Sequence, residues 1–251
     1  MAAPLVIAHR AGARHDVENS LVAIARAQGH GADAVEIDVR RTLDGVAVLQ
    51  HDLFPVRTMR WPLPLFLLPA RLATRLRLRA DGRLPTLAAA FDAAPPGLGF
   101  AIELKEPSAA RSTLVAVQGP AAAGRPLMSW SKFEAVARFF ARELSEVPGG
   151  MEITLLRDGQ TRDSTDRFLA DAHEWGATGV CVSARLLHDG VFAVAERRGL
   201  RVYTGFGTLR RQESVLAEGW PLAGFTTDWP AEAKVGLAAA SPEEDSSGGD
   251  A

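Results

Sequence analysis

The sequence contains one cysteine among its 251 residues. A single cysteine cannot form an intrachain disulfide or build a zinc site from several thiolates. Such a chain fits a reducing compartment, and we expect a cytoplasmic protein. Cys181 lies in the apolar run Gly179-Val180-Cys181-Val182, so we expect a small buried side chain there rather than a reactive thiol.

The sequence also lacks a strong charge of either sign and a long hydrophobic run. Its formal net charge is −2, which argues against a broad surface for nucleic acid. The one strongly apolar stretch, residues 61–70, contains Pro62, Pro64 and Pro69 and is about half as long as a membrane span. The first residues have neither a charged leader nor a long apolar segment, so we expect no secretory signal.

Short apolar runs typical of β-strands alternate with amphipathic stretches along the chain. We predict eight strands, at residues 5–9, 33–39, 100–104, 126–130, 151–155, 178–182, 201–204 and 223–227. Between them, apolar residues recur at helical spacing, as in 132–145 and 165–175. This alternation predicts the α/β class, and eight units favour a single closed (β/α)8 TIM barrel over an open doubly wound sheet.

Three segments depart from this alternation. Residues 46–50 follow Asp44-Gly45 too soon after the second strand for a crossover helix, so we predict an added β-hairpin strand there. Residues 53–84 form a long, lid-like insertion. The chain ends in SPEEDSSGGDA, which is acidic and rich in serine and glycine, so we predict one domain over 1–237 and a disordered acidic tail over 238–251.

Four polar clusters lie at the ends of apolar runs in the first 105 residues. They are His9-Arg10, Glu36-Ile37-Asp38, His51-Asp52 and Glu103-Leu104-Lys105. In a barrel of this type the C-terminal ends of the strands meet at one mouth, and residues two apart on a strand point the same way. We therefore expect Glu36 with Asp38, and Glu103 with Lys105, to face one cavity.

Three carboxylates at one mouth repel one another unless a cation lies among them. A site with only oxygen ligands suits Mg²⁺ or Ca²⁺, with Mn²⁺ as a further choice, better than zinc. The alternative is that these acids form salt bridges with Arg40, Arg41 and Lys105 on a solvated rim. The convergence of both polar pairs favours the metal site.

Two histidines accompany these carboxylates. His9 and His51 each end an apolar strand, and the near-neutral pKa of histidine lets one accept a proton while the other donates one. Arg10 and Lys105 are suited to phosphate oxygens, which arginine binds in bidentate fashion and lysine as a point charge. The inventory is typical of metal-assisted cleavage of a phosphate ester. The remaining histidines are interpreted as structural or solvated: His15, His30, His173 and His188.

These motifs, in this order, resemble the glycerophosphodiester phosphodiesterase family, which shares its barrel and histidine pair with phosphatidylinositol-specific phospholipase C enzymes. The segment AHRAGARHDVENSLVAIARAQGHGADAVEIDVRRTLDGVAVLQHD is similar to the family's opening motifs HRG, PENT, E-x-D-V, T-x-D-G and HD. Three later segments of this chain also match blocks of the family: LPTLAAAF, AIELKE and GFTTDWP. The resemblance spans residues 5–232 and is densest before residue 106.

The resemblance implies an enzyme of glycerophospholipid degradation that hydrolyses a small glycerophosphodiester to sn-glycerol 3-phosphate and an alcohol. It implies His9 and His51 as the acid/base pair and a divalent metal ion as cofactor. The other implied residues are the metal ligands Glu36, Asp38 and Glu103, the phosphate-holding cations Arg10 and Lys105, and a supporting shell of Glu18 and Asn19. In the related phospholipases a substrate hydroxyl attacks first, so kinship suggests a cyclic phosphate here as well.

The chain departs from the family pattern at several positions. Ala11 replaces the glycine of HRG, whereas Val17 and Ser20 replace the proline and threonine of PENT. The interval from His9 to Glu18 is the family's own, so we expect the catalytic geometry to survive. A methyl group at position 11 is expected to narrow the mouth if the backbone there has positive φ. Near the seventh strand, YTGF replaces a W-T-x-N pattern and alters the wall that selects the substrate.

The insertion combines apolar and aromatic residues with several arginines. One interpretation is peripheral contact of residues 54–68 with an anionic membrane, or cover for an acyl chain, which favours a lysophospholipase D-like enzyme acting on acylated lipids. The plainer interpretation is that these side chains pack the insertion onto the barrel. A third possibility is a catalytically impaired, ligand-binding barrel.

Overall fold

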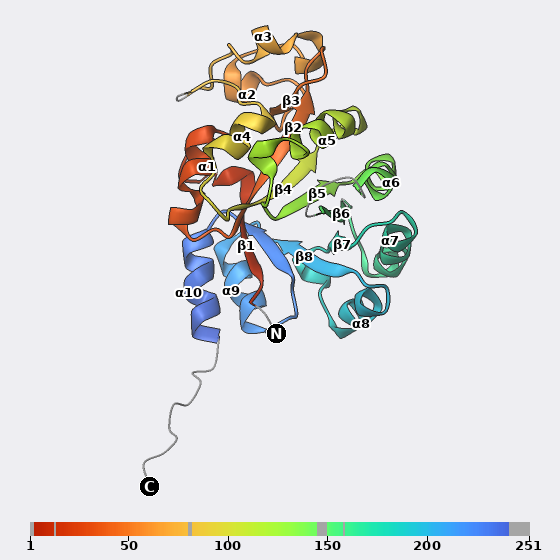
Figure 1. Ribbon diagram of the computed structural model, residues 1–251. Coiled ribbons are helices and arrows are strands. Elements are labelled where there is room, and N and C mark those ends of the chain that lie inside the picture. The colour runs from red at the N-terminus through yellow and green to blue at the C-terminus, as the bar shows by residue number, and fades with distance from the viewer. Residues whose placement is uncertain (1–2, 13, 80–81, 145–149, 158, 241–251) are drawn as a thin grey trace.

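Eight parallel strands close into a barrel in the computed structural model, which describes residues 3–12, 14–79, 82–144, 150–157 and 159–240 (Figure 1). The strands of the ring are β1 (Leu5–Ala8), β2 (Ala34–Arg41), β4 (Gly99–Leu104), β5 (Leu127–Ser131), β6 (Glu152–Leu156), β7 (Gly179–Cys181), β8 (Arg201–Gly205) and β9 (Gly224–Thr227). Strand β1 pairs with both β2 and β9, which closes the ring. The predicted (β/α)8 barrel and all eight of its strands are confirmed.

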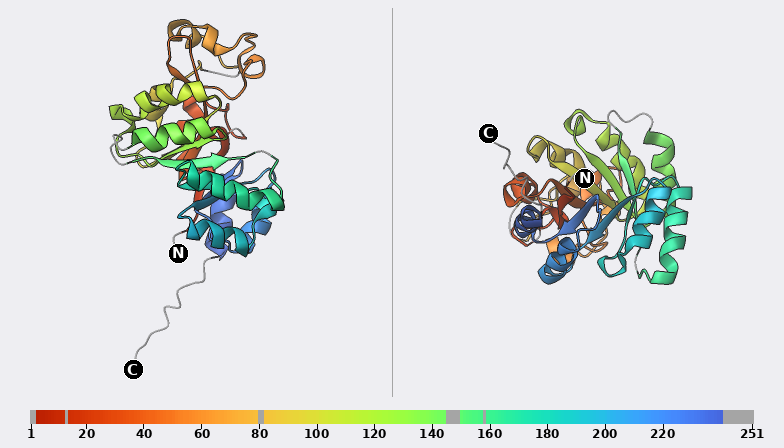
Figure 2. Two further views of the ribbon diagram at one scale, coloured as in Figure 1. Left: turned by 90° about the vertical axis from the view of Figure 1, so that its right-hand side faces the viewer. Right: turned by 90° about the horizontal axis from the view of Figure 1, so that it is seen from below.

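Helices lie outside the ring, and all but α10, which follows the last strand, connect successive strands of the ring (Figure 2). They are α1 (Leu21–Ala27), α4 (Leu87–Ala93), α5 (Ala110–Val117), α6 (Glu134–Glu143), α7 (Arg162–Glu174), α8 (Asp189–Arg197), α9 (Leu209–Ala217) and α10 (Pro230–Ala240). Hydroxyl groups satisfy free backbone N–H groups at several helix starts. Ser20 Oγ accepts from Ala23 N at 3.1 Å, so the serine at the position of the PENT threonine caps α1.

The added strand lies outside the ring. Strand β3 (Ala47–Leu49) pairs antiparallel with β2, with Val39 opposite Leu49. The predicted hairpin strand is therefore confirmed. It carries the chain back along β2 so that His51 follows close to the barrel mouth.

Strand parity divides the core into two layers. Outward side chains such as Val35, Ile37 and Val39 pack in the large cluster beneath the helices. A smaller cluster fills the inside of the ring: Ile7, Ala34, Ala101, Met128, Trp130 and Tyr203. Because residues on one strand face alternate, Glu36 and Asp38 follow Ala34 on the inward side, above this cluster.

The insertion after β3 forms a small unit of its own beside the barrel mouth (Figure 1). It contains α2 (Val56–Met59) and α3 (Ala70–Ala73) and is held by a separate apolar cluster that includes Val48, Leu65 and Leu84. At the other end of the chain, α10 continues past residue 237 to Ala240. Residues 238–240 of the predicted disordered tail are therefore helical. The rest of that tail, residues 241–251, lies outside the described residues. Within the described ranges, no helix has both the length and the apolar character needed to cross a bilayer.

Candidate active site

Three carboxylates meet at the mouth of the barrel. Glu36 and Asp38 come from β2, and Glu103 comes from β4, where it lies in register beside Asp38. One oxygen from each carboxylate lies within 4.8 Å of the others. Only 2% of Glu36 and 1% of Asp38 is exposed, so the alternative of a solvated rim is wrong for these two acids.

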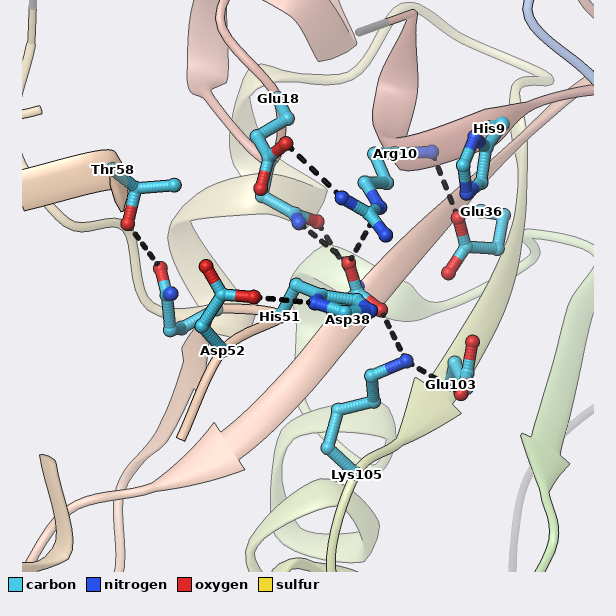
Figure 3. A network of polar contacts seen from close by, with 12 residues as sticks. His9, Arg10, Glu18, Glu36, Asp38, His51, Asp52, Thr58, Glu103 and Lys105 are labelled. Carbon is cyan, nitrogen blue, oxygen red and sulfur yellow. Dashed lines mark hydrogen bonds and ion pairs between the residues drawn. The ribbon is translucent and has the colours of Figure 1, made fainter. Parts of the chain in front are cut away.

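A lysine partly neutralises this carboxylate cluster. Lys105 Nζ lies 3.0 Å from Asp38 Oδ1 and 2.7 Å from Glu103 Oε1 (Figure 3). Burial alone would lower the pKa of Lys105, but the Asp38 and Glu103 carboxylates outweigh it and raise that pKa. Arg40 does not join the cluster; it donates to Glu106 and to the backbone carbonyl of His51.

Glu36 is the least satisfied of the three acids. Its Oε2 accepts a hydrogen bond from the Arg10 backbone N–H at 2.7 Å, whereas the buried Oε1 has no hydrogen-bond partner among the described residues. Burial, together with the nearby Asp38 charge, raises the pKa of Glu36 to about 8. A bare carboxylate oxygen at this depth is costly to desolvate, and a divalent cation bound by all three acids would remove that cost. The donor set therefore fits a hard divalent metal ion.

His9 is held by an aspartate from the far end of the chain. His9 directly follows β1, and its Nδ1 lies 2.9 Å from Asp228 Oδ1 just beyond β9. Burial lowers the pKa of His9, but the Asp228 hydrogen bond and the Glu36 charge outweigh it, so the pKa is raised overall. The same hydrogen bond lowers the pKa of Asp228.

His51 is held by its neighbour in the chain. Its Nδ1 lies 2.8 Å from Asp52 Oδ1, and the other Asp52 oxygen accepts from Arg57 Nε at 3.0 Å. Arg57 also makes a two-pronged contact with Glu18, at 2.6 and 2.7 Å. Burial raises the pKa of Glu18, but Arg57 and Arg10 outweigh it and lower that pKa. The expected supporting residue Glu18 thus ties the mouth to the insertion.

The loop after β1 adopts an unusual backbone path around these groups. Arg10, Ala11 and Asn19 have φ values of 47°, 63° and 54°, a region that non-glycine residues seldom occupy. Asn19 Nδ2 donates to Asp38 Oδ2 at 2.8 Å, and Asn19 Oδ1 accepts from Asp38 N at 3.0 Å. Arg10 Nη1 lies 3.2 Å from Glu18 Oε2. The path brings the backbone N–H of Arg10 to Glu36 and its guanidinium to Glu18.

The departures from the family pattern have local consequences. The side chain of Ala11 is buried in the cluster beneath the helices, so the expectation that its methyl group narrows the mouth is wrong, although φ is indeed positive there. A Cβ on Gly205 would lie only 2.8 Å from Thr226 Oγ1, which leaves no room for a side chain in that wall. Tyr203 is buried inside the ring, edge-on to Trp130.

A pocket of about 430 Å³ opens beside the carboxylates. Its lining includes Glu103, Lys105 and His51, and on the insertion side Leu53 and Phe54. Lys132 and Arg40 add further positive charge. The pocket thus combines a cationic wall, suited to a phosphate group, with an apolar lip.

The remaining histidines lie in structural contacts. His15 stacks on His30 with ring centroids 4.8 Å apart. His173 contacts the carbonyl of Arg198, and His188 caps α8 by accepting from Gly190 N. Cys181 is partly buried in the inner cluster, and burial together with the Glu103 charge raises the pKa of its thiol to about 12. A thiolate is not available there near neutral pH.

Sequence reasoning assigned no role to Asp52, Arg57 or Asp228. Asp52 lies in the HD motif and Asp228 in the segment GFTTDWP, so their positions at strand ends are a usable signal. Arg57 was grouped with the other arginines of the insertion. Its contact with Glu18 joins residues 39 positions apart, and no local pattern indicates it.

Comparisons with known proteins agree with this architecture. The model of the glycerophosphoryl diester phosphodiesterase family matches residues 9–232. Glycerophosphodiester phosphodiesterase 1 of Rattus norvegicus is 52% identical over 46 residues, which is 18% of this chain and 14% of the relative. A glycerophosphodiester phosphodiesterase of Caldanaerobacter subterraneus is 48% identical over 48 residues, covering 19% of this chain and 20% of that protein. The matched segments thus span a fifth or less of these relatives.

Solved structures resemble the chain over most of its length. An Oleispira antarctica phosphodiesterase, in complex with the product sn-glycerol-3-phosphate, superposes with a TM-score of 0.78 at 19% identity, covering 94% of this chain and 97% of that one. A glycerophosphodiester phosphodiesterase from Thermotoga maritima gives a TM-score of 0.73 at 21% identity, covering 94% and 99%. At this identity the likeness concerns the fold.

Proposed function

Because the chain belongs to the glycerophosphoryl diester phosphodiesterase family, we propose that it hydrolyses small glycerophosphodiesters to sn-glycerol 3-phosphate and an alcohol. One observation carries the proposal. Two histidines, each paired through Nδ1 with its own aspartate, accompany a cluster of three carboxylates, two of them buried, at one barrel mouth. The product complex of the Oleispira antarctica phosphodiesterase supports the same substrate class.

Glu36, Asp38 and Glu103 would hold the divalent metal ion, with Mg²⁺ or Ca²⁺ favoured by the oxygen-only ligands and Mn²⁺ as a further choice. When bound, such an ion supplies positive charge that polarises a phosphoryl oxygen. Asn19 holds the Asp38 carboxylate in place through its side-chain amide.

The cations and histidines of the mouth supply the remaining chemistry. Arg10 and Lys105 direct N–H donors at the phosphate oxygens and stabilise the charge that builds up as the phosphorus is attacked. One histidine accepts the proton of the attacking hydroxyl as the new O–P bond forms. The other donates a proton to the alcohol oxygen as the old P–O bond breaks. With Nδ1 held by Asp228 or Asp52, the Nε2 atom of each ring is the one that exchanges protons with the substrate.

The attacking hydroxyl is the glycerol 2-hydroxyl or a water molecule. The first route gives a cyclic phosphate that water then opens, whereas the second gives glycerol 3-phosphate directly. Phosphorus NMR during turnover distinguishes the routes, because only the first forms the cyclic phosphate and then opens it to product.

A coupled assay for glycerol 3-phosphate tests the function. We expect release from glycerophosphocholine or glycerophosphoethanolamine, loss of activity in EDTA, and recovery on adding back a divalent metal. His51→Ala and Glu36→Ala should each lower turnover by at least about 100-fold. His173→Ala, a histidine away from the mouth, serves as the matched control. Near-parental activity of either mouth variant would refute the assignment, and no turnover by the metal-loaded parent would favour the impaired, ligand-binding barrel.

A lysophospholipase D-like activity is the second candidate, favoured by the apolar lip of the pocket. Leu53 is 40% exposed and Phe54 is 54% exposed, and both line the pocket that contains His51. An acyl chain leaving the pocket would cover these side chains. The same assay separates the candidates, since faster turnover of a lysophospholipid than of its deacylated counterpart favours the second.

A further inference from the structure

Only some of the apolar side chains of the insertion are buried in its packing against the barrel. Met59, Leu65, Leu78 and others form the cluster that seals the insertion onto β3, so the plainer interpretation accounts for this set. A second set points to solvent. Of the eleven exposed large hydrophobic residues in the described ranges, seven lie between 53 and 72. We call six of them the outer set: Phe54, Val56, Leu63, Phe66, Leu67 and Leu72.

Positive charge is also concentrated in the insertion. Residues 53–84 contain seven arginines and one acid, a formal charge of +6, whereas the whole chain carries −2, so that the other residues carry −8. All seven arginines are exposed. Arg57 is engaged with Glu18 and Asp52, whereas Arg75 and Arg77 are exposed on the same unit.

We propose that the insertion docks on an anionic lipid bilayer. Its outer set would enter the headgroup region, while the arginines contact lipid phosphates. Other occupants fit less well. Two copies related by a two-fold axis would bring +6 against +6, and nucleic acid would meet exposed aliphatic side chains on an otherwise acidic molecule.

Docking in this way places the barrel mouth at the lipid surface. Phe54 belongs to the outer set and also lines the pocket that holds His51, and the insertion lies beside the mouth (Figure 1). The proposal goes beyond the proposed hydrolysis and does not depend on it, because membrane binding is measured without turnover.

The test is co-sedimentation of the full chain with vesicles of phosphatidylcholine alone or mixed with phosphatidylserine. We expect binding to the mixed vesicles, weaker binding in high salt, and little binding to phosphatidylcholine. Phe66→Ser/Leu67→Ser should weaken binding by at least about tenfold, since each side chain contributes through buried apolar area. Arg75→Glu/Arg77→Glu should weaken it by at least about 25-fold, because each arginine near an anionic surface contributes about fivefold.

Matched controls lie elsewhere on the surface. Val115→Ser/Val235→Ser removes two exposed apolar side chains outside the insertion, and Arg111→Glu/Arg142→Glu reverses two exposed charges on α5 and α6. Both should bind like the parent. Turnover of glycerophosphocholine should stay near parental in Phe66→Ser/Leu67→Ser, which shows that the variant folds.

Three results would overturn the proposal. One is negligible binding of the parent to the mixed vesicles, and another is equal loss in the controls. The third is self-association of the parent, abolished by Phe66→Ser/Leu67→Ser, without vesicle binding. If hydrolysis persists in any of these cases, the proposed function stands while the membrane proposal fails.

Discussion

Each histidine at the mouth has an aspartate partner, but the two pairs differ in how the chain brings them together. Asp52 is the residue next to His51, whereas Asp228 lies 219 positions from His9. The first pair exists wherever the chain adopts the local turn. The second pair exists only when β1 and β9 close the barrel, so the effect of Asp228 on the pKa of His9 requires the folded state.

Replacing Asp228 by asparagine should lower the pKa of His9, because the variant loses the hydrogen bond and the charge that raise it. The pair stabilises the fold when His9 is protonated and Asp228 is ionised. Its contribution is therefore present between the lowered pKa of Asp228 and the raised pKa of His9. It disappears as the pH rises through the folded pKa of His9.

NMR titration of the His9 ring protons measures the pKa directly in parent and Asp228→Asn. Urea unfolding at several pH values measures the stability difference, which should be largest below the ordinary histidine pKa of about 6.5 and smaller in alkali. Asp171→Asn, which alters a partly buried ion pair with Arg157, should leave the His9 pKa unchanged. An unshifted His9 in Asp228→Asn would contradict the prediction.

At the scale of elements, the Arg57 side chain ties the insertion to the active site. Arg57 of α2 donates to Glu18 in the loop after β1 and to Asp52 beside His51. The contact joins three segments that share no strand pairing. We therefore predict that Arg57, through Asp52, positions His51 as well as linking these segments.

Removing this link by Arg57→Gln should lower kcat by about tenfold with little change in KM, since the ring of His51 loses its fixed orientation while the phosphate contacts remain. The pKa of Glu18 should rise toward its ordinary value, because Arg57 is its main stabilising partner. Arg57→Lys should recover part of the activity by restoring one charge.

Arg75→Gln is the control for this substitution, because it removes an exposed arginine of the same insertion that is not among the residues lining the pocket. Steady-state kinetics and the pH profile of kcat are the measurements. A structural role alone would lower stability without changing kcat or its pH dependence in the folded enzyme, and that result would contradict the positioning role.

Strand alternation and parity were enough to predict the barrel, the hairpin strand and the direction of the carboxylates. These features depend on local periodicity, and Glu36, Asp38 and Glu103 meet because β2 and β4 are neighbours in register. The pairing of His9 with Asp228 and the contact of Arg57 with Glu18 depend on ring closure and on the path of the insertion. The division of the insertion into buried and exposed apolar sets likewise requires the three-dimensional packing.

At the scale of the whole molecule, we expect the carboxylate cluster to make stability depend on pH and on divalent metal. The pKa of Glu36 is raised from 4.5 to about 8, so the folded state holds a proton that the unfolded state releases between these values. Stability without metal should therefore fall as the pH rises through this range. A divalent cation at the cluster replaces that proton, and its stabilising effect should increase over the same range.

Thermal unfolding with Mg²⁺ or EDTA measures this effect. At a metal concentration about 100-fold above Kd, we expect Tm to rise by about 5 to 10 °C above pH 8 and by much less near pH 5. Potassium at matched ionic strength should change Tm little, because a site of three carboxylates favours a divalent cation. Glu36→Gln should flatten the fall in stability with pH and weaken the response to Mg²⁺, since it removes both the titrating group and a ligand. An equal Mg²⁺ response in parent and variant would show that the cation binds elsewhere.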